Sequence, residues 1–429
     1  MILEGCAVAT VAGDVFADGH VVVEDDRIAA VGPGRYAGPG ERLDLSGHLV
    51  TPGLINCHHH LYQWATRGRA QQATLFEWLV ELYPVWARID ERVLRAAARA
   101  GLAALLRSGC TTASDHHYVF PAGQDLLRVE IEAARELGIR FHPCRGSMDL
   151  GVSAGGLPPD SVVEDRDAIF AAYAAALDEF HDPSPGAMCR IALAPCSPFS
   201  VTRELMRETA VFARERGVRL HTHMAETVEE EAFCLERFGM RPVEYLEDLG
   251  WLGDDVWLAH CVHLSEREVA RFGETRTGVA HCPSSNARLG AGIAPVMPLV
   301  RAGAPVGLGV DGAASNEAGE LAGELRQALY SARLRGGPAA MTAHEALELA
   351  TLHGARCLGR EDELGTLEPG KLADLAWWRL DDLDHAGIED PVAALVFGAR
   401  PLAAGVMVGG ARVDTDFEAI AAELAEVRL

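Results

Sequence analysis

The strongest constraint in this 429-residue sequence is a regular alternation of short apolar segments and longer amphipathic ones, which begins near residue 49. The short segments have the length of buried strands, and the longer ones have the apolar spacing of helices. The expected strands cover 49–56, 111–114, 139–143, 190–195, 218–223, 256–260, 278–282 and 305–310. Eight strands alternating with helices predict an α/β fold with a (β/α)8 TIM-like barrel. A doubly wound open sheet is the alternative, but polar residues at nearly every strand's carboxyl end favour the barrel.

The two ends of the chain have a different pattern. The first fifty residues contain short extended segments separated by glycine and proline turns. Strand-and-turn character resumes after residue 363, where 406–408 and 411–413 predict a hairpin around Gly409 and Gly410. We therefore expect residues 51–362 to form the barrel. Residues 1–50 and 363–429 are expected to form a small composite β-sandwich domain from both termini.

Composition excludes several classes of protein. Hydrophobic residues make up 49% and charged residues 23% of the chain, which is typical of a globular protein. We expect no membrane span and no signal peptide, because no apolar run is long enough and no basic residue precedes Arg27. The net charge of −24 disfavours nucleic acid and anionic membranes as partners. Ten cysteines without a C-x-x-C motif indicate a reducing compartment, so we expect a cytoplasmic protein.

The strongest chemical signal is the segment Asn-Cys-His-His-His at 56–60, directly after the first barrel strand. Side chains alternate along a strand, so His58 and His60 face the same way. Two imidazoles at one strand end can form half of a metal site. His59 faces the other way and is not expected to be a ligand.

Two later strands also end in histidine. The strand at 218–223 ends in His223, and Glu226 follows three residues later. A glutamate beside a metal-bound water can shuttle its protons, although a carboxylate here can also belong to the first turn of a helix. His260 ends the strand at 256–260, where it is either a ligand or a second base and hydrogen-bond donor near the water.

Asp311 follows the last barrel strand, which covers 305–310. A carboxylate at the end of a buried strand is costly unless it is paired or bound to a metal. Asp311 can therefore supply an anionic ligand and accept a proton from an attacking water. A buried helix cap is the alternative.

These four motifs, on strands one, five, six and eight, resemble those of the amidohydrolase superfamily. The resemblance covers essentially the whole chain, including Gly-Lys-Leu-Ala-Asp-Leu at 370–375. It implies a distorted barrel that binds one or two divalent metals at its mouth. It also implies that the metal ligands are His58, His60, His223 and Asp311, that Glu226 is the proton shuttle and that His260 orients the water.

The number of metals follows from the end of strand four. Members of the superfamily with two metals carry a lysine or glutamate there, whereas this chain reads Leu-Ala-Pro-Cys-Ser-Pro at 193–198. A second metal on Cys196 is disfavoured. We therefore expect one divalent metal, and three histidines with one carboxylate suit Zn²⁺, with Fe²⁺ as the alternative.

The His-x-x-Glu pair after strand five resembles the deaminase and chlorohydrolase branch of the superfamily. This implies hydrolysis of a C–N bond in a cyclic amidine with release of ammonia. Further motifs at 58–63, 75–86, 114–118, 145–148, 155–163 and 281–286 resemble bacterial 8-oxoguanine deaminases. They imply conversion of 8-oxoguanine to uric acid, with isocytosine-type rings as further substrates.

Three residues are predicted to contact the substrate. The Gln63 amide can bind a purine edge, Arg145 can hold a ring carbonyl, and His117 can contact the ring. Each has an alternative: Gln63 facing solvent, a structural salt bridge for Arg145 and a core position for His117. Trp64 departs from the family pattern, and it either narrows the pocket or packs beneath the loop.

Other functions stay open. The same site suits s-triazines, pterins or guanine, with loss of chloride or an amine. A non-catalytic metal-binding barrel is a more distant alternative, and it would require a lost ligand. We expect a small heterocycle as the partner and a homo-oligomer, a dimer or larger, as the assembly.

Overall fold

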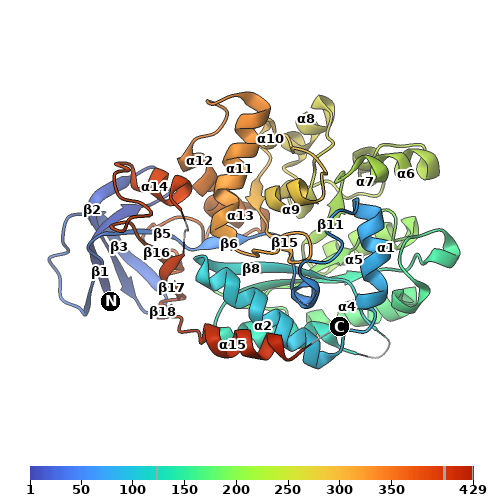
Figure 1. Cartoon of the computed structure of the whole chain (residues 1–429), viewed down its shortest axis with the longest axis horizontal. Coiled ribbons are helices and arrows are strands. Elements are labelled where there is room, and N and C mark those ends of the chain that lie inside the picture. The colour runs from blue at the N-terminus through green and yellow to red at the C-terminus, as the bar shows by residue number, and fades with distance from the viewer. Residues whose placement is uncertain (122–123, 400–401, 428) are drawn as a thin grey trace.

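Eight parallel strands close into a barrel, which confirms the predicted fold class (Figure 1). The computed structural model describes residues 1–121, 124–399, 402–427 and 429. The barrel strands are β6 (Leu54–Asn56), β8 (Cys110–His117), β9 (Arg140–Ser147), β10 (Ala192–Pro195), β11 (Leu220–Met224), β12 (Val256–His260), β13 (Gly278–His281) and β14 (Val306–Leu308). Their parallel pairing brings all eight carboxyl ends to one rim.

The helices around the barrel begin where capping residues allow. Asp90 precedes α2, for example, and its carboxylate accepts a hydrogen bond from the backbone of Val93. Within the described residues, no helix is both long and apolar enough to cross a membrane. The helices are α1 (Leu75–Trp86), α2 (Glu91–Arg107), α3 (Leu126–Leu137), α4 (Arg166–Phe180), α5 (Arg203–Glu215), α6 (Val228–Phe238), α7 (Pro242–Asp248), α8 (Glu266–Thr275), α9 (Pro283–Arg288), α10 (Val296–Ala302), α11 (Leu321–Gly336), α12 (Ala343–Glu348) and α13 (Gly354–Cys357), with the short turns η1 (Leu61–Thr66), η2 (Val152–Ala154), η3 (Asp160–Val162) and η4 (Leu349–His353).

The first predicted strand, 49–56, is two strands in the structure. Its first half, β5 (His48–Pro52), belongs to a separate sheet, and only β6 enters the barrel. Gly53 separates them, and a Cβ there would lie 2.1 Å from Oγ1 of Thr111. The glycine therefore permits the close approach of the two segments where the chain changes sheets.

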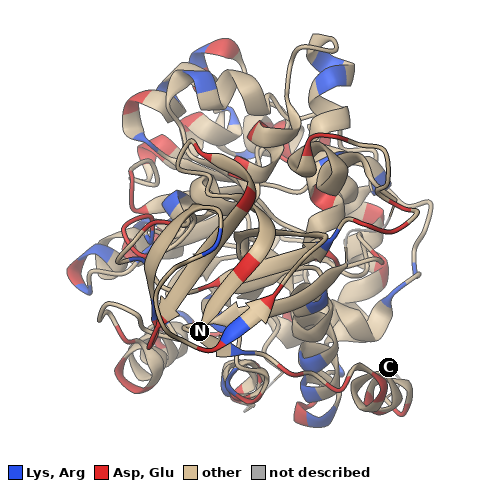
Figure 2. Cartoon of the chain, turned by 90° about the vertical axis from the view of Figure 1, so that its left-hand side faces the viewer, with Lys and Arg blue, Asp and Glu red and all other residues tan. Residues whose placement is uncertain are grey.

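Strands from both ends of the chain form this second sheet (Figure 2). The antiparallel pair β5–β16 joins the two ends, and Gly409 and Gly410 form the predicted hairpin turn, both with positive φ. The order is β18-β17-β16-β5-β1-β2-β3, with β4 beside β1. Their bounds are β1 (Ile2–Ala9), β2 (Val15–Glu24), β3 (Arg27–Pro33), β4 (Arg42–Asp44), β16 (Leu375–Arg379), β17 (Ala403–Val408) and β18 (Ala411–Arg412). This pairing supports, as a proposal, the domain division 1–50, 51–362 and 363–429.

The C-terminal part also contains two helices, α14 (Pro391–Phe397) and α15 (Phe417–Ala425), which the strand-and-turn pattern did not predict. Helix α15 packs against α2 on the outside of the barrel. An ion pair of 2.8 Å between Arg99 and Glu423 joins the two helices. The last residues of the chain thus cover the barrel and do not extend the sheet.

A buried ion pair connects the barrel to the terminal sheet. Arg140, at the start of β9, donates two hydrogen bonds of 3.0 and 2.9 Å to the carboxylate of Asp374, which precedes β16. The guanidinium also donates to the carbonyls of Gly186 and Ala187, and Asp374 accepts a further bond from the backbone of Gly409. The pair is therefore fully hydrogen-bonded, which offsets the cost of burying both charges.

A buried acidic cluster lies behind the first histidine segment. On β8, Asp115 accepts a 2.6 Å hydrogen bond from the backbone of Leu61, and His117 lies 2.8 Å from Oε1 of Glu130 on α3. The other imidazole nitrogen of His117 donates to the carbonyl of Val119. Burial raises the pKa of Glu130 to about 8 and lowers that of His117 to about 4, so Glu130 is the proton donor of this pair near neutral pH. The cluster holds the chain in place directly after His60.

We predict that Asp374→Ala lowers the free energy of unfolding by about 3–5 kcal/mol, because it leaves the Arg140 charge buried and unpaired. Urea titration followed by circular dichroism measures this change. Glu208→Ala is the control, since it breaks an exposed pair with Arg166 and should cost at most about 1 kcal/mol. Equal losses in the two variants would contradict a structural role for the buried pair.

We also predict that Glu130→Gln makes the stability of the folded protein less dependent on pH. The folded state keeps Glu130 protonated up to about pH 8, whereas the unfolded chain ionises it near 4.5. In the wild-type protein, the stability that Glu130 contributes is therefore fully present below pH 4.5, and it is lost as the pH rises through 8. The melting temperature of the variant, relative to wild type, should rise from pH 5 to pH 8. Exposed Glu208→Gln is the control, and parallel curves for Glu130→Gln and wild type would refute the assignment.

Candidate active site

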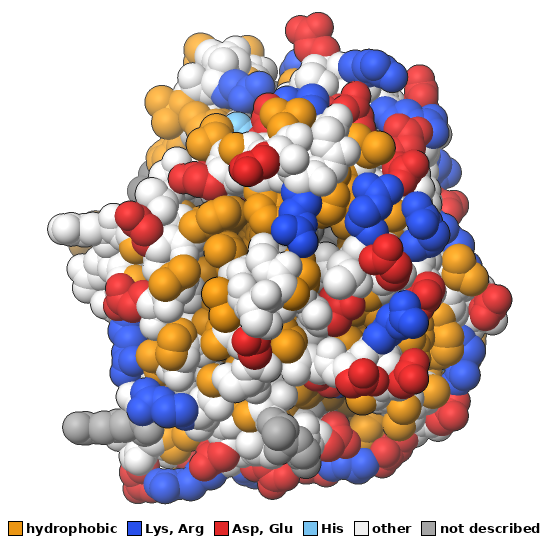
Figure 3. All heavy atoms as spheres, turned by 90° about the vertical axis from the view of Figure 1, so that its right-hand side faces the viewer, with side chains coloured by type: hydrophobic (Ala, Val, Ile, Leu, Met, Phe, Trp, Pro, Cys, Tyr) orange, Lys and Arg blue, Asp and Glu red, His pale blue; other side chains and the backbone are white. Residues whose placement is uncertain are grey.

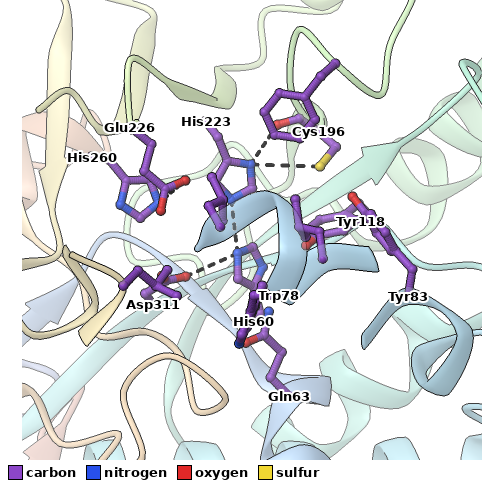
Figure 4. A pocket seen from close by; sticks show the side chains of 14 residues that line it. His60, Gln63, Trp78, Tyr83, Tyr118, Cys196, His223, Glu226, His260 and Asp311 are labelled. Atoms are coloured by element: carbon purple, nitrogen blue, oxygen red, sulfur yellow. Dashed lines mark hydrogen bonds and ion pairs between the residues drawn. The ribbon is translucent and has the colours of Figure 1, made fainter. Parts of the chain in front are cut away.

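The six residues predicted for catalysis and metal binding converge at the carboxyl rim of the barrel. Figure 4 labels five of them, His60, His223, Glu226, His260 and Asp311, and the ring of His58 lies beside Asp311. Two short strands beyond the rim, β7 (His59–His60) and β15 (Asp311–Gly312), pair in parallel and bring Asp311 beside the histidine segment. His223 lies on β11 and His260 ends β12, while Glu226 lies just before α6. Sequence positions more than 250 residues apart therefore meet in one buried site.

The ring nitrogens of three histidines and one carboxylate oxygen meet at its centre. Nε2 of His60 lies 3.1 Å from Nε2 of His223. Oδ1 of Asp311 lies 3.3 Å from Nε2 of His60 and 3.4 Å from Nε2 of His58. Nε2 of His58 is buried and has no hydrogen-bond partner among the described residues.

The hydrogen bonds made by the other ring nitrogen, Nδ1, show which nitrogen of each imidazole carries the proton. Nδ1 of His60 donates to the carbonyl of His116, and Nδ1 of His223 donates to the carbonyl of Cys196, both at 2.7 Å. Burial lowers the pKa of His60 to about 4 and that of His223 well below its usual value, so both rings are neutral. Each therefore presents an unprotonated Nε2 to the other.

Two nitrogen lone pairs that face each other at 3.1 Å repel, unless a cation lies between them. His58 is held in the same way, because its Nδ1 lies 2.8 Å from Nε2 of His221, whose Nδ1 donates to the carbonyl of Trp257. Neutral histidines fixed through Nδ1, with Nε2 free, are the usual donors to a divalent metal. The residues present therefore fit such an ion.

Asp311 is held as an anion. Its Oδ2 accepts hydrogen bonds from the hydroxyls of Ser285 at 2.5 Å and Ser315 at 3.0 Å, which leaves Oδ1 facing the histidines. Burial alone would raise the pKa of Asp311, but the adjacent imidazole of His58 and the charge of His260 outweigh it and hold that pKa well below the usual value. Its backbone φ of 59° lies in the left-handed region, a strain typical of functional sites.

Glu226 and His260 form a pair beside these nitrogen and oxygen atoms. Oε2 of Glu226 lies 3.7 Å from Nε2 of His260, whose Nδ1 donates to Oδ1 of Asn286 at 3.0 Å. Burial raises the pKa of Glu226 to about 7. Burial alone would lower the pKa of His260, but the carboxylates of Glu226 and Asp311 outweigh it and raise that pKa. A carboxyl group that titrates near neutrality suits general acid–base chemistry.

The turn that carries Glu226 is built by a second buried glutamate. The carboxylate of Glu230 on α6 accepts hydrogen bonds from the backbone nitrogens of Ala225 and Glu226, at 2.8 and 2.9 Å. Ala225 has a positive φ of 50°. The backbone is therefore bound by Glu230, and the Glu226 side chain is free to line the cavity.

The site opens into a narrow cavity. Metal-facing residues line one part, and mostly apolar side chains line the rest: Leu75, Trp78, Leu79, Phe199 and Leu289. Gln63, Tyr83, Tyr118 and Cys196 are its other polar residues. Oε1 of Gln63 is buried without a hydrogen-bond partner in the described chain, as expected of a group that awaits a ligand.

The helix α1, which lies on the right-hand side of Figure 1, contributes one wall of this cavity. Four of its residues, spaced by three or four positions, line the cavity: Leu75, Trp78, Leu79 and Tyr83. Figure 3 shows this face of the molecule, where apolar side chains gather in the middle and charged ones surround them. The site histidines therefore lie beneath an apolar cover.

The structure does not bring the other two predicted substrate contacts to this cavity. His117 faces Glu130 in the cluster behind the histidine segment. Arg145 donates two hydrogen bonds, of 3.0 and 2.7 Å, to Glu164, and its guanidinium lies 3.5 Å from the ring centre of Phe120. Both side chains find their partners on neighbouring elements, which their own positions on strands do not reveal.

Trp64 also lies outside the cavity lining. Its indole fills the space that Gly101 and Gly319 leave open, where a Cβ would lie 2.8 and 2.6 Å from it. Its Nε1 points to His59, at 3.4 Å. Trp64 therefore packs beneath the loop, which is one of the two roles considered for it.

Several residues of the site were missed in the sequence. His221 lies two positions before His223 on the same strand face, so the alternation that singled out His58 and His60 also applies to it. His116 stacks on His223 with ring centres 4.8 Å apart and donates to the carbonyl of Ala194. The Asp311 and His260 partners Ser285 and Asn286 lie in the Pro-Ser-Ser-Asn motif at 283–286, whose contacts only the fold reveals.

Known proteins are similar to this chain in both sequence and fold. The chain is 51% identical to the 8-oxoguanine deaminase of Pseudomonas aeruginosa, over 92% of this chain and 89% of that protein. It is 39% identical to an isoxanthopterin deaminase of an unknown prokaryote, over 91% of this chain and 85% of that one. The crystal structure of atrazine chlorohydrolase TrzN from Arthrobacter aurescens, complexed with zinc, superposes with a TM-score of 0.94, at 36% identity and 99% coverage of both chains.

The model of the amidohydrolase family matches residues 49–413, a span that contains the whole barrel and every residue of the site described above. The homologues are hydrolytic enzymes that act on C–N bonds of small heterocycles. With a closed (β/α)8 barrel and a polar site at its carboxyl rim, this chain belongs to the amidohydrolase family.

Proposed function

We propose that this enzyme hydrolyses 8-oxoguanine to uric acid and ammonia. The observation that carries the proposal is the position of Glu226, a carboxyl group with a pKa of about 7, beside converging histidine nitrogens in a cavity that also has an apolar wall. An aminated aromatic ring needs this combination, because its π system resists attack until a ring nitrogen is protonated. The 51% identity to an 8-oxoguanine deaminase supports this choice of ring.

We propose that His58, His60, His223 and Asp311 hold one divalent metal, most simply Zn²⁺, with Fe²⁺ as the alternative. Three neutral imidazoles and a carboxylate are a donor set that zinc favours. A single ion is supported by Cys196 at the end of β10, because burial raises the pKa of its thiol to about 12 and a protonated thiol is a poor ligand. When bound, the metal supplies Lewis acidity that makes water nucleophilic at neutral pH.

The protein side chains then move the protons. Asp311 and His260 orient the attacking water by hydrogen bonds, and Glu226 takes its proton and delivers it to the ring nitrogen next to the reacting carbon. A C–O bond forms at that carbon. Glu226 receives the second water proton and passes it to the amino group, so that the C–N bond breaks with ammonia as the leaving group.

Gln63 is proposed to orient the ring. Its unpaired Oε1 can accept a hydrogen bond from a ring N–H, while its amide nitrogen can donate to a neighbouring carbonyl. Of the three residues considered as substrate contacts, only Gln63 lines the cavity, so we assign no contact to His117 or Arg145.

We propose a cytoplasmic homo-oligomer, a dimer or larger. Ten free cysteines, all buried, support a reducing compartment. Exposed apolar side chains on α11 and α14, Tyr330, Leu334 and Phe397, support a subunit contact there.

We predict that the zinc-loaded protein holds about one metal per chain, as a site with four protein ligands and one ion requires. His223→Ala should lose most of this metal, because it removes a central donor. Elemental analysis after desalting measures the content. His344→Ala, at an exposed histidine paired with Asp390, is the control and should keep the metal. Two ions per chain, or full retention by His223→Ala, would contradict the proposed site.

We predict that the zinc-loaded enzyme releases ammonia from 8-oxoguanine faster than from guanine, isoxanthopterin or aminotriazines, and that it also accepts isocytosine.

Glu226→Gln should lower kcat by about 10²–10⁴-fold with the metal retained, because it removes the proton carrier. A coupled ammonia assay gives the rates, and Glu229→Gln on the same helix is the control. Activity on adenine or cytosine alone would overturn the substrate, and an unchanged Glu226→Gln rate would overturn the mechanism.

A further inference from the structure

The helix α1 contributes one uncommitted polar group to the cavity, the hydroxyl of Tyr83. Of its four cavity-lining residues, Leu75 and Leu79 are apolar. The indole Nε1 of Trp78 already donates to the carbonyl of Ala314 at 3.3 Å. The Tyr83 hydroxyl is buried and has no hydrogen-bond partner in the part of the chain that the structure describes.

The surroundings of this hydroxyl favour donation to a ligand. Burial raises the pKa of Tyr83 well above its usual value, so the phenol stays protonated. Its polar neighbour is the thiol of Cys196, and sulfur is only a weak acceptor. The ring packs edge-on against Trp86 with centres 5.7 Å apart, which fixes its direction. A buried donor without a partner is unfavourable, and a ligand oxygen in the cavity would satisfy it.

The position of Tyr83 in the cavity determines which end of a bound substrate lies beside its hydroxyl. In Figure 4, Glu226 and His260 lie to one side of His60 and His223, and Tyr83 lies to the other. A ring whose amino-bearing carbon lies beside Glu226 therefore extends its far end toward Tyr83. In 8-oxoguanine, the amino-bearing carbon and the carbonyl of the five-membered ring are at opposite ends of the purine.

We propose that Tyr83 determines specificity by donating a hydrogen bond to the carbonyl oxygen of the five-membered ring of 8-oxoguanine. This inference rests on the proposed function. Isocytosine carries the same amino-bearing ring but ends before that carbonyl, so Tyr83 has nothing to bind in it. The side chain thus favours the oxidised purine over the smaller pyrimidine without any part in the chemistry.

The test compares Tyr83→Phe with wild type on these two substrates, using zinc-loaded enzyme and an ammonia assay. The variant should lower kcat/KM for 8-oxoguanine by about 3- to 10-fold, chiefly through KM, because one neutral hydrogen bond is lost. The kcat/KM for isocytosine should change by less than about 2-fold, because the hydroxyl makes no bond to it. Tyr245→Phe is the matched control. It removes another buried hydroxyl without a partner in the described chain, from a ring that stacks on Phe238 away from the cavity lining, and it should leave both values unchanged.

Three results would overturn the inference. Equal losses for both substrates would mean that the hydroxyl acts on packing or on the common ring, and no loss for either would mean that it binds no substrate. Wild-type enzyme that releases ammonia from neither compound would refute the proposed function, and the role of Tyr83 with it. The first two results leave the proposed function standing, so the two failures are distinguishable.

Discussion

The site depends on one interaction, the approach of two unprotonated imidazole nitrogens on His60 and His223 to 3.1 Å. Each ring is fixed because its other nitrogen donates to a backbone carbonyl at the end of a neighbouring strand, and burial keeps both rings neutral. Parallel strands in fixed register place those carbonyls. The barrel thus stores an electrostatic cost at its rim, which a bound cation relieves, so the scaffold is preorganised for the metal before it binds.

The backbone at the rim is strained, which is a second energetic cost at the site. Four non-glycine residues at the ends of β11 and β12 and at the start of β15 have positive φ: Ala225, His260, Cys261 and Asp311. Such conformations are rare outside glycine and persist where the surrounding structure fixes them. Glu230 fixes the first by binding two backbone nitrogens, and Ser285 and Ser315 hold the carboxylate of the last. Strain and buried polar contacts thus coincide with the residues proposed to do the chemistry.

The alternation of strands and helices in the sequence was sufficient to predict the barrel, and strand periodicity together with the family resemblance pointed to the polar residues at its rim. Alternation along a strand singled out His58 and His60, and the same rule applied to β11 would have found His221. The partners of His117 and Arg145 could not be predicted, since Glu130 lies on α3 and Glu164 in the loop before α4, and only the fold brings them together. The division of 49–56 into two strands likewise depends on a tertiary contact between Gly53 and Thr111.

The helix α1 contributes a wall of the cavity that is separate from the polar rim of the barrel. Its apolar spacing is that of a core helix, and Trp86 does pack in the core, yet the adjacent turns form one wall of the cavity. A substitution at Trp78, Leu79 or Tyr83 therefore changes the shape and polarity of that wall without moving a metal ligand, because the ligands lie on the barrel rim. The apolar wall and the polar rim are thus carried by separate elements of the fold.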